Sequence, residues 1–163
     1  MNDYKLRPLD PEEDIELFRV AYNWRSTPKR HTQPTRMPFE TFSANNPTQL
    51  VIGLFNGELQ AVYAIVEWEP RRFEVHFTSA KSAPKEPVRL GAQQVLNFML
   101  ENGAKEVVAF VVSRNRPLRR FVESIGFRSE ARVAFLTCAE IANESNMTQR
   151  DQRKVFTKYA IRG

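Results

Sequence analysis

The chain has few of the residues that build disulfide frameworks and metal centres: among its 163 residues, one is cysteine and two are histidine. The single Cys138 excludes an internal disulfide, and having only His31 and His76 argues against a metal cluster. No apolar run approaches the 18 or so residues of a membrane span, and the first residues lack the apolar region of a signal peptide. We therefore expect a cytoplasmic protein without a membrane partner.

What is present is an ordinary globular composition, with 42% apolar and 26% charged residues. This composition and the length predict a single domain, 1–163, large enough to bury a core. The net charge of +5 fits binding of a polyanion, such as a phosphorylated cofactor, a nucleic acid or an acidic acceptor. A modest positive charge is also common in proteins that bind no polyanion.

The first residues predict a strand followed by a helix. Residues 4–9 alternate as a strand does. Asp10 is a typical N-cap, Pro11 fits the first helical position and Glu13 the third, so we expect a helix to begin at this point. The apolar stripe of that helix comprises Ile15, Phe18 and Tyr22.

The next part of the chain predicts a loop, a short helical segment and a hairpin. Residues 25–36 mix basic side chains with proline and small polar residues, which is typical of a long loop. Residues 37–43 can form one or two helical turns. Strands at 50–55 and 59–68 are joined by Asn56-Gly57, a strong hairpin signal.

The central part predicts a parallel crossover. A strand at 73–80 leads through a polar loop, 81–87, into a helix entered at Val88, and a second strand follows at 106–112. A strand, helix and strand in this order are typical of a parallel unit with a ligand-sized gap at the switch point.

Residues 115–127 predict a short amphipathic helix with a sharp stop. Pro117 lies near the first turn, and Gly126 follows as the residue that ends the helix. Its apolar positions are Leu118, Phe121, Val122 and Ile125. Two more strands, 131–137 and 155–161, flank a long polar connection.

In segment 115–127 and in the order of its elements, the chain resembles the GCN5-related N-acetyltransferase (GNAT) superfamily. That family has an asparagine at a strand end, an aromatic residue six positions later and Gly-Phe at the helix end, which correspond to Asn115, Phe121 and Gly126-Phe127. The resemblance implies an α+β, GNAT-like acyl-CoA N-acyltransferase fold, with a mixed, mostly antiparallel sheet of about seven strands flanked by about four helices.

The resemblance also implies where acetyl-CoA, the acyl donor, would bind. The two parallel strands of the family splay apart and pair with the pantetheine arm, and the pyrophosphate lies on backbone N–H groups at the start of the following helix. The cofactor-binding residues implied here are Phe77, Thr78, Ser79, Val88, Arg89, Leu90, Gly91, Ala92, Asn115 and Phe121.

Two positions depart from the family pattern. The phosphate signature Gln/Arg-x-x-Gly-x-Gly/Ala keeps only Gly91, because Val88 replaces its first residue and Gln93 its second small one. The family often uses the hydroxyl of an aromatic residue to protonate the departing thiolate, whereas Phe121 has none.

Transfer to an amine needs a group that removes the amine proton. Glu74 and His76 share one face of the predicted strand 73–80 and are our candidates for this catalytic base, with Glu67 a weaker third. A solvated strand face beside Arg71 and Arg72 is the alternative interpretation of the same pattern.

Two functional hypotheses follow. The first is an acetyl-CoA-dependent N-acyltransferase in which an amine attacks the thioester directly, within a ternary complex. The second is a catalytically silent protein of the same fold that binds a partner or nucleic acid through its basic surface. Arg114, Arg116, Arg119 and Arg120 could serve either, but aromatic residues are not interleaved with them, so nucleic acid is the less favoured partner.

Overall fold

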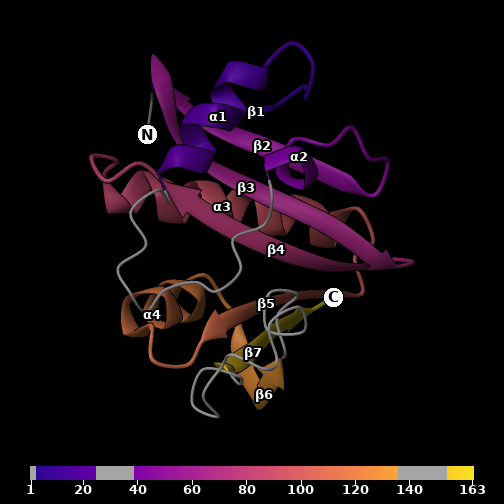
Figure 1. The fold of residues 1–163 in the computed structure, drawn as a ribbon. Helices are drawn as coiled ribbons and strands as arrows, with labels where there is room; N and C mark the ends of the chain where they lie inside the picture. The colour runs from indigo at the N-terminus through magenta and orange to yellow at the C-terminus, as the bar shows by residue number, and fades with distance from the viewer. Residues whose placement is uncertain (1–2, 25–38, 136–153) are drawn as a thin grey trace, which may run out of the picture.

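The computed structural model describes residues 3–24, 39–135 and 154–163 (Figure 1). The predicted loop 25–36, the polar connection that begins at Ala139, Cys138 and His31 lie outside these residues.

Within these described residues, seven strands form one sheet in the order β1-β2-β3-β4-β5-β7-β6. They are β1 (Lys5–Pro8), β2 (Gln49–Asn56), β3 (Glu58–Glu69), β4 (Arg72–Ser79), β5 (Glu106–Val112), β6 (Arg128–Phe135) and β7 (Lys154–Arg162). All neighbours are antiparallel except β4 and β5, which run parallel. The expected mixed, mostly antiparallel sheet is confirmed, and Gly57, with a φ of 71°, makes the predicted tight turn between β2 and β3.

Four helices cover the sheet in the described part of the chain: α1 (Ile15–Asn23), the single turn α2 (Phe39–Phe42), α3 (Lys85–Glu101) and α4 (Arg116–Ser124). Figure 1 shows α1 and α2 on one face of the sheet and α3 on the other. Phe18 and Ala21 of α1 pack with Val62 and Ala64 of β3, while residues of α3 and α4 share a larger core with the other face. None of these helices is long and apolar enough to cross a membrane.

The predicted start of the first helix was wrong by about a turn. Asp10 does accept hydrogen bonds from the backbone N–H groups of Glu12 and Glu13, at 2.8 and 3.1 Å, but these residues form a separate turn. The Asp14 carboxylate in turn accepts a hydrogen bond from the Asp10 N–H at 2.8 Å and forms an ion pair with Arg7. The α-helix begins only at Ile15.

The predicted start of the third helix was also wrong, because α3 begins at Lys85 and not at Val88. Pro84 is the extended N-cap residue, and Pro87 lies inside the first turn. A proline is tolerated there because the first N–H groups of a helix have no partner within the helix. Val88 to Ala92 therefore lie one turn or more inside the helix.

The short helix α4 agrees with the prediction at both ends. Asn115 accepts a hydrogen bond from the Leu118 N–H at 3.3 Å and so caps the helix, and Pro117 lies in the first turn. Gly126 has a φ of 108° and ends it, while the Phe127 N–H donates to the Val122 carbonyl at 3.1 Å.

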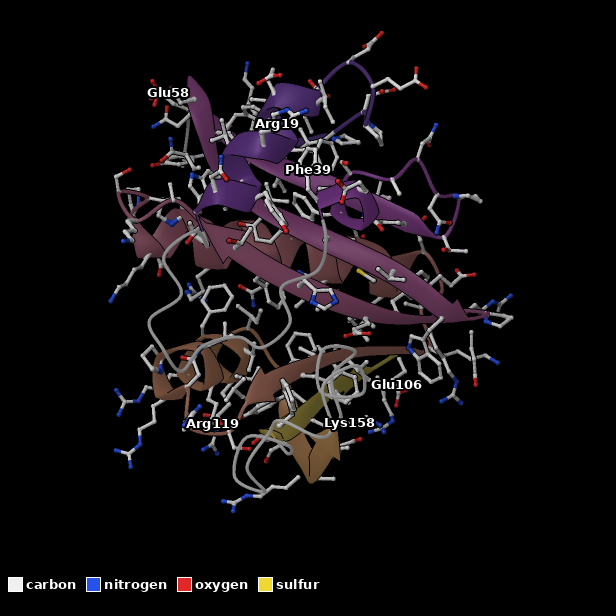
Figure 2. All side chains as sticks on the ribbon, in the orientation of Figure 1. Arg19, Phe39, Glu58, Glu106, Arg119 and Lys158 are labelled. Carbon is white, nitrogen blue, oxygen red and sulfur yellow. The ribbon has the colours of Figure 1, made fainter. Side chains whose placement is uncertain are left out.

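The parallel strands are fastened together at their amino-terminal ends. The Arg71 carbonyl accepts from the Lys105 N–H at 2.8 Å. The Glu106 carboxylate, whose side chain is 6% exposed, forms ion pairs with Arg72 of β4 at 3.4 Å and with Arg162 of β7 at 2.9 Å. These contacts hold β4, β5 and β7 together at the end of the sheet opposite α4 (Figure 2).

Candidate active site

The parallel strands β4 and β5 pair over only a short stretch. Their ladder consists of Arg72 with Glu106, Phe73 with Val107 and Glu74 with Val108. Beyond Glu74, β4 continues to Ser79 and stays paired with β3, while β5 continues to Val112 paired with β7. The two strands therefore separate after Glu74 and Val108, as the resemblance implied.

Backbone groups at the ends of both strands point toward the space between them. In β4, the Ala80 N–H donates to Gln60 at 2.9 Å, so even-numbered residues face β3 and Ser79 faces β5. In β5, the Lys105 carbonyl accepts from Gly163 at 3.1 Å, so odd-numbered residues face β7 and Val112 faces β4. Two strand edges that face each other without pairing suit an extended, amide-containing chain.

Glu74 and His76 come together on β4. The Glu74 Oε1 and His76 Nε2 atoms lie 3.2 Å apart, and the two side chains are 31% and 37% exposed. His76 pairs across the sheet with Ala64, which packs against α1, so both side chains lie on the α1 face. Glu74 is also the last β4 residue in the ladder with β5. The two candidates for the base thus lie where the strands begin to separate.

The contact has a chemical consequence for the imidazole. A carboxylate beside Nε2 favours the tautomer with the proton on that nitrogen, and the lone pair is then on Nδ1. This arrangement of a base and an orienting carboxylate is the one that activates nucleophiles in many enzymes. Glu67, the third candidate, pairs with Phe73 instead and is not part of this contact.

The other face of β4 carries an aromatic cluster. The ring of Phe77 packs edge-on against Phe121 of α4, with ring centroids 5.5 Å apart, and against Phe127 at 6.4 Å. It also contacts Tyr63 of β3 at 6.1 Å. These contacts join β4 to α4 across the separated strands, so α4 borders the space between them on the α3 face.

The motif residues of α3 have structural partners. The Tyr63 hydroxyl donates to the Val88 carbonyl at 2.7 Å, and burial raises the pKa of this phenol. A Cβ atom on Gly91 would lie 2.6 Å from that hydroxyl. Val88, Gly91 and Ala92 are buried against the sheet, and Leu90 is half-buried. Packing alone therefore accounts for the small residue at 91, and contact of this segment with a donor stays a prediction.

The first turn of α3 differs from a good phosphate cradle. Lys85, Glu86 and Pro87 begin the helix, and none is glycine. Pro87 has no N–H, and a hydrogen bond from Arg89 lowers the pKa of the Glu86 carboxyl, which keeps a negative charge at the helix start. The strand edges fit the pantetheine arm of acetyl-CoA, but this turn does not fit the pyrophosphate in the family's usual way.

The arginine side chains of α4 place positive charge near the end of the sheet where β4 and β5 are separated. Arg119 is engaged: its Nε donates to the Tyr159 hydroxyl at 3.0 Å and its Nη1 to the Ser113 carbonyl at 3.1 Å. Arg116 and Arg120 are exposed and make no ion pair with any residue that the structure describes. Figure 2 shows nitrogen-tipped side chains around α4, with Arg119 labelled.

The sequence analysis missed two residues at this site. Tyr63 was placed only as part of a strand, and its contact with α3 joins segments distant in the chain, which no periodic pattern reveals. Glu86 was counted in a loop because the helix start was placed too late. Pro84 was the available signal, since proline often precedes or begins a helix.

Among the described residues, no group of three or more His, Cys, Asp or Glu side chains could hold a metal ion. The sequence matches no protein-family model and no curated protein. Solved structures do match over nearly the whole chain.

An N-acetyltransferase from Staphylococcus aureus Mu50 superposes with a TM-score of 0.74 at 12% identity, over 98% of this chain and 97% of that one. A variant of spermidine N-acetyltransferase from Vibrio cholerae gives 0.71 at 12% identity, over 99% and 95%. An IAA acetyltransferase from Bacillus cereus gives 0.68 at 12% identity, over 98% and 99%.

These likenesses show that the chain has the fold of the GNAT N-acetyltransferases, as the resemblance in sequence implied. At this level of identity the shared feature is the fold.

Proposed function

We propose that this protein is an N-acyltransferase that moves the acyl group of acetyl-CoA to an amine. The observation that carries the proposal is the position of the Glu74–His76 pair, whose carboxylate and imidazole atoms lie 3.2 Å apart where β4 leaves β5. A base at this point is within reach of an amine attacking a donor placed between the strands. The fold shared with N-acetyltransferases supports the same activity.

Bound acetyl-CoA would supply a thioester: the amine nitrogen bonds to the carbonyl carbon, the carbon–sulfur bond breaks, the amine proton goes to the protein, and solvent protonates the thiolate. His76 takes that proton on Nδ1, and Glu74 holds the ring in the tautomer that leaves Nδ1 unprotonated. The backbone edges of Ser79 and Val112 orient the donor.

The acceptor amine approaches from the α1 face, because His76 and Glu74 point to that face. Phe121, which stands where the family often has a hydroxyl, lies on the opposite face beside Phe77. It gives no proton to the leaving group. Solvent can take this role because a thiolate is a good leaving group with a pKa near that of cysteine, about 8.5.

The proposal is tested by measuring free thiol released from acetyl-CoA in the presence of a panel of amines that includes a polyamine, free amino acids and a peptide. His76→Gln should lower kcat about 100-fold or more, because it removes the base. Glu74→Gln should lower kcat less, because the ring stays in place without its carboxylate. Affinity for CoA should not change in either variant.

Glu58→Gln is the matched control, because Glu58 is an exposed carboxylate at the start of β3 and takes no part in the Glu74–His76 contact. A larger loss in Glu74→Gln than in His76→Gln would make Glu74 the base. Wild-type protein that binds acetyl-CoA but acylates no amine in the panel, or full activity in the Glu74→Gln/His76→Gln double variant, would contradict the proposal.

A further inference from the structure

We infer that the phosphates of the acyl donor are held by Arg116 and Arg120 on α4 and not by the backbone of α3. This inference rests on the proposed function, since it concerns the donor of that reaction. It begins from the disagreement described above: the strand edges fit a pantetheine arm, whereas the first turn of α3 contains Glu86 and Pro87. The phosphate groups then need cations from another element.

The helix α4 begins at the end of the sheet where a donor would leave the space between β4 and β5. Because β4 and β5 are parallel, their carboxyl ends lie at the same end of the sheet, and α3 and α4 begin there (Figure 1). The ring contact between Phe77 and Phe121 fixes α4 beside the end of β4. A ligand that leaves the space between the strands at this end must therefore pass between the start of α3 and the start of α4.

Not every arginine of α4 is available for a ligand. Arg119 is tied to Tyr159 and Ser113, where it holds α4 on the sheet. Arg116 and Arg120 are one turn apart, so their side chains project from the same side of the helix. Both are exposed, and neither pairs with an acidic group among the residues that the structure describes.

The start of α3 offers the phosphates fewer free guanidinium groups than α4 does. Arg89 is engaged by Glu86, so this pair contributes little net charge to a ligand. Lys81 and Lys85 are exposed and add long-range attraction. Guanidinium groups bind phosphate in a bidentate manner, so two of them a turn apart can hold a pyrophosphate or a pyrophosphate and a further phosphate.

Side-chain binding predicts a different response to salt than a backbone cradle would give. Exposed cations lose much of their attraction as ionic strength rises, whereas short backbone hydrogen bonds within a cleft are screened less. The affinity for CoA should therefore fall steeply with salt. The affinity for pantetheine, which carries no phosphate, should hardly change.

The test is calorimetric titration of the purified protein with CoA and with pantetheine, at low and at moderate salt. Arg116→Gln/Arg120→Gln should weaken CoA binding about tenfold at low salt and leave pantetheine binding unchanged. Arg128→Gln/Arg132→Gln is the matched control. It removes the same charge from exposed positions of β6 and should bind CoA as wild type does.

The outcomes separate the inference from the function. If wild type binds CoA and Arg116→Gln/Arg120→Gln binds it equally well, the inference is overturned while the proposed function stands. An equal loss in the control variant would reduce the effect to net charge and would also overturn it. If wild type binds neither CoA nor pantetheine, the proposed function fails and the inference fails with it.

Discussion

Gly91 offers the sharpest test of how the sequence encodes this fold, because two explanations of the residue make opposite predictions. The family pattern assigns the glycine to phosphate, and the structure assigns it to Tyr63. A Cβ at position 91 would lie 2.6 Å from the Tyr63 hydroxyl and 3.3 Å from the ring carbon that bears it. Most of the clash thus comes from one oxygen atom.

The size of the effect follows from three contributions. Gly91→Ala gains about 1 kcal/mol from helix propensity. It forces Tyr63 to move in a closely packed core, which costs about 1–3 kcal/mol, and weakens the hydrogen bond to the Val88 carbonyl, worth about 1 kcal/mol. We expect Gly91→Ala to lower the free energy of unfolding by about 1–3 kcal/mol.

Tyr63→Phe removes the obstructing oxygen. Alone it should cost about 1 kcal/mol, for the lost hydrogen bond. In the Tyr63→Phe background, Gly91→Ala should then be close to neutral, so the two substitutions should be coupled by about 1–3 kcal/mol. Urea denaturation of the four proteins measures this coupling, provided that the slopes of the unfolding curves agree.

An equal loss of stability from Gly91→Ala in both backgrounds would refute the packing explanation. The Tyr63→Phe/Gly91→Ala variant also separates stability from binding. If it folds well and binds CoA as wild type does, phosphate does not need a glycine at this position. If it folds well but loses CoA, the family's explanation of Gly91 is restored.

Three further predictions concern stability. Gly126→Val should lower the free energy of unfolding by about 1 kcal/mol or more in thermal or urea denaturation, because φ is 108° and the new Cβ would touch Ile161 at 3.4 Å; an unchanged melting temperature would contradict it. Glu106→Gln should lower the free energy of unfolding by about 1–3 kcal/mol, because it removes the buried negative charge that pairs with Arg72 and Arg162. This loss should depend little on salt, because a buried charge is weakly screened. The hydrogen bond from Arg7 lowers the pKa of Asp14, so the carboxylate stabilises the folded state above the unfolded-state pKa of about 3.9, and this stabilisation is lost as pH falls through the lower folded-state value. Asp14→Asn should therefore flatten the dependence of the free energy of unfolding on pH below about pH 4, and an unchanged dependence would exclude this contribution.

The order of the elements could be predicted because each element carries its own local signal. The turn at Asn56-Gly57, the cap at Asn115 and the stop at Gly126 depend on residues close in the chain, and all three are in the structure. The pairing of Glu74 with His76 was also accessible, because alternate residues of a strand share one face. Their contact at 3.2 Å is a direct result of that spacing.

The errors occurred where a local signal had more than one meaning. Pro84 and Pro87 can each begin a helix, and the choice depends on how α3 packs on the sheet. Asp10 and Asp14 are both of a residue type that often caps helices. Asp14 is the residue before the helix, but its carboxylate binds Arg7 of β1 and the Asp10 N–H and makes no cap hydrogen bond. A partner on another element cannot be read from the cap itself.

The arrangement of the two faces of β4 bears on which proton transfers the proposed reaction would leave to the protein. Glu74 and His76 lie on the α1 face, whereas Phe77 turns to the other face and packs on Phe121. Alternation along one strand thus separates the two candidates for the base from an apolar wall that has no proton to give. For a donor between the strands, the aromatic contact would cover the opposite side near α4, so the proposed reaction takes its acceptor from the α1 face. Under the proposed function, the protein would therefore assist proton removal from the acceptor, which needs a positioned base, and would leave protonation of the thiolate, which needs little help, to solvent.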